Sequence, residues 1–282
     1  MPRPEGTWPL AVGVVKFASC DGCQLALLGL GSLLLELGER FHIVEFGEAS
    51  SNRSSGPYDL LLVEGSISTS EQAHEIRELR ARSTLLVTIG ACATSGGIQA
   101  LRGWVDSAGV AASVYPRPDE ISSLATATPI SDHVAVDAEL RGCPIDPGQL
   151  VELITAVSVG RRPQLPDESV CADCKRLGRV CVVGATGEPC LGPVTRTGCG
   201  ALCPGYARGC YGCFGPREHA NTASLAKDFG WRGLDDLEIS RRFSLFTGWS
   251  PAFRSVAMAH GGPPGFRAEP DVAATTKPEE TA

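Results

Sequence analysis

The distribution of cysteine constrains this chain more than any other feature of its sequence. Eight of the twelve cysteines lie between Cys171 and Cys213. The densest stretch, CLGPVTRTGCGALCPGYARGCYGC at 190–213, sets five of them among glycines and prolines. Because glycine and proline interrupt helices and strands, this stretch cannot build long regular secondary structure. Bound metal is the interaction that can hold such a segment folded.

Charge and apolar patterning indicate a cytoplasmic protein. The net charge of −7 excludes a general affinity for nucleic acid or anionic membranes. The longest apolar run, at 25–37, is broken by glycines and a serine and is too short to span a bilayer. The first residues lack the basic region, apolar core and cleavage site of a secretory signal. In a reducing compartment, twelve cysteines point to metal ligation and against a disulfide framework.

The first part of the chain predicts an α/β domain over residues 10–162. Short, continuous apolar runs alternate with segments that read as helices. This alternation is typical of a parallel sheet with helices on both faces. We expect strands at 10–18, 41–46, 58–65, 84–90 and 133–137, and helices at 24–39, 69–83 and 147–160.

Four cysteines follow strands of this predicted sheet. Cys20 and Cys23 come after the first strand, Cys92 after the fourth and Cys143 after the fifth. The carboxyl ends of parallel strands share one edge of a sheet, where such folds place their sites. We therefore expect the four thiols to converge. Glu64 ends the third strand at the same edge and is either an ordinary loop carboxylate or a group with a role beside the thiols.

The chain changes character at about residue 163. A proline-bearing linker leads into a second predicted domain, 163–260, which shows little hydrophobic periodicity and one helix-like segment at 217–230. We expect metal clusters to take the place of a hydrophobic core there, so that the region beyond residue 165 is disordered without metal. The last segment, 261–282, has the composition of a disordered tail.

The spacing of the cysteines leaves more than one kind of site open. Three pairs have C-x-x-C spacing, which serves zinc, iron–sulfur clusters and redox-active dithiols. Twelve is three sets of four, and a [4Fe–4S] cube takes four thiolates. Zinc ribbons are compact modules, whereas the first four cysteines span a whole α/β domain, which favours iron–sulfur clusters. A non-redox zinc scaffold is the alternative. The five histidines do not cluster, and the glycine motif of nucleotide-binding loops is incomplete.

Six ordered motifs resemble those of [NiFe]-hydrogenase small subunits. They are SCDGC at 19–23, VEGS at 63–66, GACATSGG at 90–97, GCP at 142–144, CLGPVT with its following cysteine at 190–199, and GCYGC at 209–213. The compact C-terminal part looks most like the delta subunit of cytoplasmic NAD(P)-linked hydrogenases, the sulfhydrogenase group. The resemblance covers residues 11 to about 216 and implies a flavodoxin-like domain followed by a small, irregular iron–sulfur domain.

The resemblance also implies how the cysteines divide among three [4Fe–4S] clusters. The proximal cluster, nearest the nickel–iron centre of a separate large subunit, falls to Cys20, Cys23, Cys92 and Cys143. The distal cluster falls to Cys171, Cys174, Cys181 and Cys190, with Cys171 where many relatives have a histidine. The medial cluster takes Cys199, Cys203, Cys210 and Cys213, one cysteine more than the three-iron cluster of many periplasmic relatives.

The implied function is electron transfer in a cytoplasmic [NiFe] hydrogenase. The large subunit would carry the active site, and iron–sulfur and flavin subunits would pass electrons to or from NAD(P). The RGCYGC stretch resembles the nickel-binding motif of large subunits but lacks the glycine directly after its first cysteine, and no second D-P-C-x-x-C motif follows. We therefore expect no nickel and no catalytic residue in this chain. The alternative is a subunit of the respiratory NADH dehydrogenase type. That family places two adjacent cysteines in its first loop, which SCDGC separates, and it would leave the last eight cysteines unexplained.

Overall fold

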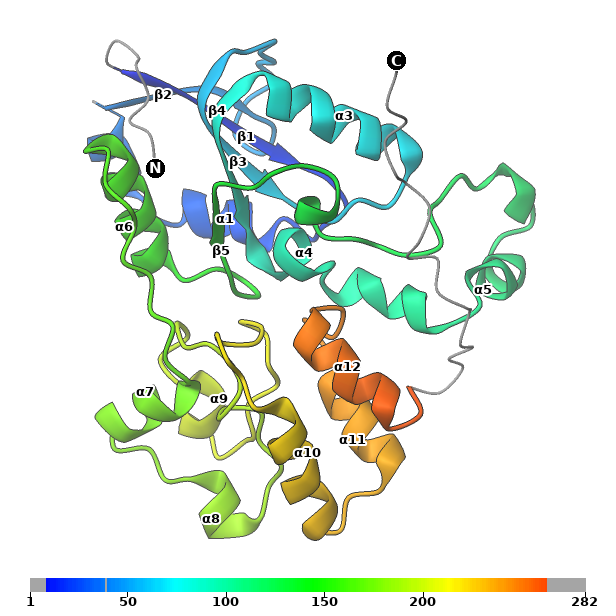
Figure 1. The fold of residues 1–282 in the computed structure, drawn as a ribbon. Coiled ribbons are helices and arrows are strands. Elements are labelled where there is room, and N and C mark those ends of the chain that lie inside the picture. Colours follow the sequence, from blue (N-terminus) through cyan, green and yellow to red (C-terminus); the bar gives the residue numbers. More distant parts are fainter. Residues whose placement is uncertain (1–8, 39, 263–282) are drawn as a thin grey trace, which may run out of the picture.

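The computed structural model describes residues 9–38 and 40–262. Its first part is a five-stranded, fully parallel sheet in the order β2-β1-β3-β4-β5 (Figure 1). The strands are β1 (Leu10–Lys16), β2 (Phe41–Phe46), β3 (Tyr58–Glu64), β4 (Ser83–Ile89) and β5 (Ala138–Leu140). This is the flavodoxin-like strand order, in which the switch point lies between β1 and β3. The predicted α/β fold with a parallel sheet is confirmed.

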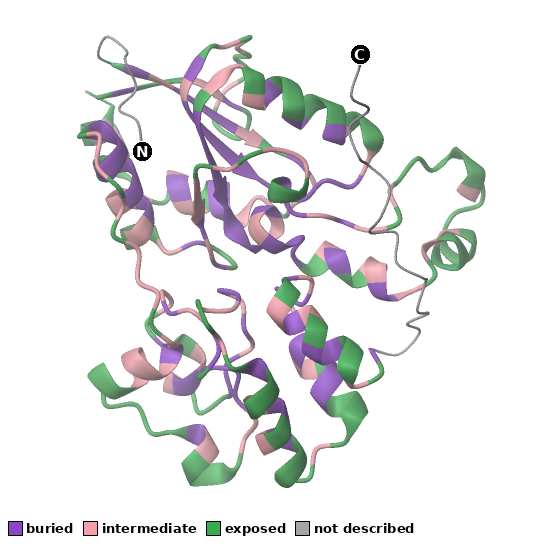
Figure 2. Ribbon diagram, in the orientation of Figure 1, coloured by how far each residue is buried: buried purple, intermediate pink, exposed green. Residues whose placement is uncertain are grey.

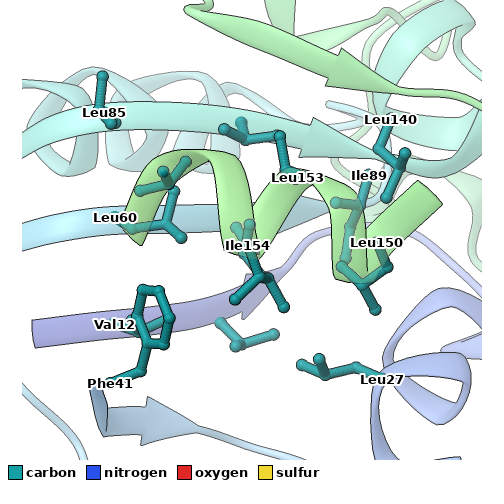
Figure 3. Close-up of a cluster of buried hydrophobic side chains, with 14 of the residues drawn as sticks. Val12, Leu27, Phe41, Leu60, Leu85, Ile89, Leu140, Leu150, Leu153 and Ile154 are labelled. Carbon is teal, nitrogen blue, oxygen red and sulfur yellow. The ribbon is translucent and has the colours of Figure 1, made fainter. Parts of the chain in front are cut away.

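Helices cover both faces of the sheet, and most residues of β3 and β4 are therefore buried. On one face, α1 (Gly22–Leu28) and α6 (Pro147–Ser158) pack on the strands through Leu27, Leu150 and Leu153, part of the cluster in Figure 3. On the other face, α3 (Ser70–Ala81) packs through Ala73, Ile76 and Leu79. Thr69 caps α3, since its hydroxyl accepts from the Gln72 amide at 3.2 Å.

Two predicted elements of the sheet part were wrong in their bounds. The single helix over 24–39 is two short helices, α1 and α2 (Ser32–Leu37), separated by a turn in which Gly31 has a φ of 57°. The fifth strand lies at Ala138–Leu140 and not at 133–137. Residues 130–132 form the turn η3 (Ile130–Asp132), and the amides of His133 and Val134 both donate to the carbonyl of Ile130, so they cannot join the ladder.

A long excursion separates β4 from β5. It contains α4 (Gly90–Ser95), the 3-10 helices η1 (Ile98–Trp104) and η2 (Pro118–Glu120), and α5 (Ser107–Val114). The helix α5 projects to one side of the molecule and has no buried residue (Figure 2). By contrast, η1 runs toward the C-terminal part of the chain, and its Trp104 is 2% exposed.

The C-terminal part holds more regular structure than the sequence predicted. Its helices are α7 (Val170–Arg176), α8 (Val182–Thr186), α9 (Leu202–Gly205), α10 (Thr222–Trp231), α11 (Asp236–Phe243) and α12 (Pro251–Ala259). The last three pack around Phe229, Phe243 and Phe253, and Trp104 of η1 joins this core with its ring 5.5 Å from that of Trp249. The expectation of a single helix and of no hydrophobic core was therefore wrong.

The C-terminal end and the length of the helices bear on the predicted tail and on membrane insertion. Of the predicted disordered tail, 261–282, residues 263–282 lie outside the described residues. Within the described part of the chain, no helix is both long and apolar enough to cross a membrane.

Candidate metal centres

The first four cysteines converge at the carboxyl edge of the sheet. Cys23 lies in α1 directly after β1, Cys92 lies in α4 after β4, and Cys143 follows β5. Burial raises the pKa of the Cys92 thiol to about 11, and the thiolates of Cys143 and Cys20 add to this rise against a hydrogen bond to Gln99. Burial likewise raises the pKa of Cys23, and the charges of Cys92 and Cys143 raise it further. The four thiols thus lie within electrostatic reach of one another, as the sequence predicted.

Two glycines with positive φ leave room at these sulfurs. A Cβ at Gly90, whose φ is 87°, would collide with the sulfur of Cys23. A Cβ at Gly97, whose φ is 65°, would lie 2.6 Å from the sulfur of Cys92. Only glycine adopts such backbone angles without strain and leaves the space beside a thiolate open. The edge of the sheet is therefore shaped to admit a group bound to these sulfurs.

Glu64 lies at the switch point between β1 and β3 and is 1% exposed. Its two carboxylate oxygens accept from the amides of Cys23 and Gln24 at 3.2 and 3.3 Å. Burial raises the pKa of the Glu64 carboxyl, while these amides lower it. The carboxylate fixes the start of α1, on which Cys23 sits, so it positions a candidate ligand and is not an ordinary loop residue.

Gln99 is a neighbour of the site that sequence reasoning missed. Its amide group lies between the sulfur of Cys92, at 3.4 Å, and the carbonyl of Ala18, to which it donates at 2.7 Å. Hydrogen-bonded neighbours of a metal site orient the residues that bind the metal. No signal in the sequence marks Gln99, because its contacts join segments that lie 81 residues apart.

The second set of cysteines gathers around α7 and α8. Cys171 and Cys174 lie on α7, Cys181 stands at the N-cap position of α8, and Cys190 is buried. Burial raises the pKa of Cys174 to about 11, and the thiolates of Cys171, Cys190 and Cys181 raise it further. The structure thus brings together the four cysteines that the resemblance assigned to a distal cluster.

The third set lies between the other two. Burial raises the pKa of Cys213 to about 12, and the thiolates of Cys199, Cys143 and Cys203 contribute in that order. Cys210 is also buried, and burial raises its pKa; among its neighbours are Cys190 and Cys213. This part of the chain therefore places Cys199, Cys203, Cys210 and Cys213 in one neighbourhood.

Backbone amides in the C-terminal part point at the sulfurs. The sulfur of Cys190 accepts from the amides of Gly192 and Cys210 at 3.4 and 3.2 Å, and the sulfur of Cys210 accepts from Gly212 at 3.4 Å. Such N–H···S bonds favour a thiolate over a thiol and tune the potential of a bound cluster. The glycines of the dense stretch thus allow the chain to wrap closely around its cysteines.

Each of the three cysteine sets lies beside the next. Cys213 of the third set lies within electrostatic reach of the thiolate of Cys143 of the first. Cys190 of the second set accepts from the amide of Cys210 of the third. The twelve thiols therefore form a continuous succession from the switch point of the sheet to α7 and α8, at the other end of the molecule (Figure 1).

The donor sets fit iron–sulfur clusters. All twelve cysteines are free thiols. Each of the three sets offers four thiols, and a [4Fe–4S] cube takes four thiolates, each bound to a different iron.

Known proteins share both the sequence and the fold. A family model described as NADH ubiquinone oxidoreductase, 20 Kd subunit, matches residues 20–157. Sulfhydrogenase 2 subunit delta of Pyrococcus furiosus is 36% identical over 241 residues, which cover 85% of this chain and 100% of that protein. A vhu subunit of the F420-non-reducing hydrogenase of Methanocaldococcus jannaschii is 31% identical over 278 residues, with 85% and 96% covered.

Solved structures of [NiFe] hydrogenases are similar in fold to this chain. A chain of an NAD+-reducing [NiFe]-hydrogenase in its H2-reduced state has a TM-score of 0.52 at 25% identity, over 56% of this chain and 95% of that one. The actinobacterial-type NiFe-hydrogenase from Ralstonia eutropha H16 has a TM-score of 0.55 over 90% and 86%, and at 17% identity it shows the shared fold. Sequence, strand order and cysteine positions lead to one conclusion: this chain belongs to the family of [NiFe]-hydrogenase small subunits.

Proposed function

We propose that this chain is the electron-transfer subunit of a cytoplasmic [NiFe] hydrogenase and that it holds three [4Fe–4S] clusters. The observation that carries the proposal is the unbroken succession of three four-cysteine sets, joined where Cys213 meets Cys143 and where Cys210 meets Cys190. Bound at these sites, the clusters would supply one-electron chemistry. The large subunit, which splits or forms H2, would dock at the sheet edge beside Cys20 and Cys143, both of which are exposed.

The chain's own residues position and insulate each site. Glu64 and Gln99 hold the segments that carry Cys23 and Cys92. The amides of Gly192, Cys210 and Gly212 stabilise thiolate charge in the buried C-terminal sites. Burial of Cys23, Cys190 and Cys210 keeps water from these sulfurs. These features set the spacing and the potentials, which is what a protein contributes to an electron relay.

We further propose that the electrons pass to or from NAD(P) through separate iron–sulfur and flavin subunits. The support is the likeness to the sulfhydrogenase delta subunit and to HoxS subunit delta, which is named as part of an NAD-reducing hydrogenase and is 26% identical over 172 residues. The respiratory alternative is supported by the family model over 20–157. That model ends before Cys171, so it leaves eight cysteines without a role.

Metal analysis of the anaerobically purified complex tests the proposal. We expect about twelve irons and twelve acid-labile sulfides per copy of this chain, beyond those of any other iron–sulfur subunit. Nickel should appear only together with a second, larger chain. About three zinc ions per chain without sulfide would refute the electron relay and leave the zinc scaffold.

A further inference from the structure

The ring of Phe214 lies where the first and third cysteine sets meet. Phe214 follows Cys213 directly and is 4% exposed. Two glycines face its ring. Gly142 directly precedes Cys143 of the first set, and Gly198 directly precedes the first cysteine of the third set. A Cβ at Gly142 would lie 2.8 Å from the Cζ of Phe214, and a Cβ at Gly198 would lie 2.5 Å from its Cε1. One aromatic ring therefore packs against ligand loops of both sets.

The turn that carries Phe214 is held from both parts of the chain. A backbone hydrogen bond of 2.9 Å closes this turn over 212–215. Thr247, which lies between α11 and α12, donates its hydroxyl to the first carbonyl of the turn at 2.7 Å. Arg141, which directly follows β5, donates to the carbonyl of Pro216 at 3.2 Å. In Figure 1 the turn belongs to the yellow segment between β5 and the C-terminal helices. The backbone of Phe214 is thus fixed relative to both parts.

A further contact connects the ring to a second ligand of the first site. The carbonyl of Gly142 accepts from the amide of Ala91 at 2.7 Å, and Ala91 stands next to Cys92 on α4. A displacement of the loop at Gly142 would therefore move both Cys143 and Cys92. Because the same ring also packs against the loop of the third set, its size determines how far the two sites lie apart.

We propose that Phe214 is a positioning residue that fixes the spacing between the proximal and medial clusters and keeps water out of the space between them. The inference rests on the proposed function, because it concerns the electron step between two of the three proposed clusters. Protein interiors are densely packed, so a buried ring that contacts two loops sets their separation. The apolar shell of a metal site controls solvent access and, through it, the redox potential.

Polar groups border the ring, so its removal would admit water. The side-chain amide of Gln149 lies beside the ring, since both would collide with a Cβ at Gly198. The guanidinium of Arg141 lies 3.3 Å from the place of a Cβ at Gly215, the residue after Phe214. A cavity with polar partners of this kind can hold water, whereas an apolar cavity stays dry. Water there would stabilise the reduced form of each neighbouring cluster, which carries one more negative charge, and would raise its potential.

The test uses the complete complex with its large subunit and compares the wild type with Phe214→Ala and Phe214→Leu. Electron paramagnetic resonance of the reduced complex shows the magnetic interaction between neighbouring clusters, which weakens steeply with distance. In Phe214→Ala the loops are no longer held by the ring, so the splitting from the proximal and medial clusters should broaden. Redox titration should place both potentials higher than in the wild type. Phe214→Leu keeps a branched apolar side chain and should lie between the two.

Activity assays separate the electron step from the reaction at the large subunit. H2-dependent reduction of NAD(P)+ should fall several-fold in Phe214→Ala, because its electrons cross the space beside the ring. Exchange of hydrogen isotopes between H2 and water needs no electron relay and should be unchanged.

Phe229→Ala provides the matched control. Phe229 is 1% exposed, and its ring lies 6.2 Å from that of Phe243 in the core of α10, α11 and α12. The control removes the same buried ring from another place, so it should lower the melting temperature and leave the splitting and both potentials unchanged. The iron content should stay at about twelve per copy of this chain in all three variants.

The outcomes are distinct. A splitting and potentials in Phe214→Ala equal to those of the wild type, or equally changed in Phe229→Ala, would overturn the role of Phe214 alone. Loss of about four irons in both Phe214 variants would also overturn it, because the ring would then hold ligands and not the space between clusters. A wild-type complex that lacks the signals of a proximal and a medial cluster would instead count against the proposed electron relay itself.

Discussion

Replacing Gly90 by alanine should empty the proximal site and leave the other two filled. Gly90 begins α4, two residues before Cys92, and has a φ of 87°. An L-residue in this region costs about 1–2 kcal/mol. In addition, the new methyl group would overlap the sulfur of Cys23, which has no free space to move because it is 6% exposed. Strain and collision together should displace a ligand of the site.

Gly233 provides the matched control. Its φ is 95°, close to that of Gly90, but a Cβ there would have no atom within 4 Å. Gly233→Ala should therefore show the strain alone. At roughly 2–4 °C per kcal/mol for a domain of this size, its melting temperature should fall by about 2–8 °C with no loss of iron.

The assay is iron per chain in the complex, followed by redox-titrated electron paramagnetic resonance. Gly90→Ala should lose about four irons and the signal of one cluster. H2-dependent reduction of the small dye benzyl viologen should be lost together with these irons. If Gly90→Ala keeps its full iron content and all cluster signals, the proximal site does not lie at the sulfurs of Cys23 and Cys92.

Three further predictions concern the relay, the sheet and the C-terminal core. Cys92→Ser should abolish H2-dependent NAD(P)+ reduction by the complex, and full activity would contradict its role as a ligand. Burial and hydrogen bonding to Glu45 raise the pKa of Tyr58 to about 12, so its contribution to stability is present below the unfolded pKa of about 10 and is lost as the pH rises from there toward 12. Melting temperatures measured from pH 8 to 11 should therefore fall less steeply for Tyr58→Phe than for the wild type, and parallel curves would refute this. Phe243→Ala should reduce the free energy of unfolding by about 3–5 kcal/mol while the iron content is unchanged, as chemical denaturation with metal analysis would show. A loss below about 1 kcal/mol would mean that the clusters alone hold the C-terminal part.

The sequence predicted the sheet well because its strands are continuous apolar runs. The segment at 84–90, for example, is β4, displaced by one residue. The convergence of Cys20, Cys23, Cys92 and Cys143 followed from strand order, because the carboxyl ends of parallel strands share an edge. The errors at 24–39 and 133–137 arose where a local turn ended an apolar run, which periodicity alone does not register.

Of the C-terminal helices, the sequence predicted only the segment at 217–230, which is α10, and it missed the others for a different reason. Phe229, Phe243 and Phe253 are far apart in sequence, and each helix contributes only a few residues to their common core. One local signal was available. Asp235 and Glu238 have the spacing of a capping box, and both of its hydrogen bonds are present at the start of α11. The contact between Gln99 and Ala18 joins segments 81 residues apart and has no such signal.

The spacing of the thiols along the chain also bears on how the protein is assembled. The second and third sets each close over a short stretch, 171–190 and 199–213, so the entropic cost of bringing their sulfurs together is small. The first set joins Cys20 to Cys143, and its sulfurs meet only when β1, β3, β4 and β5 have assembled into the sheet. During synthesis, Cys20 and Cys23 emerge more than a hundred residues before their last partner. We expect these two thiols to remain reduced and without metal until the sheet has folded. A series of chains truncated on either side of residue 143 would show this as an abrupt gain in the iron held by the sheet part.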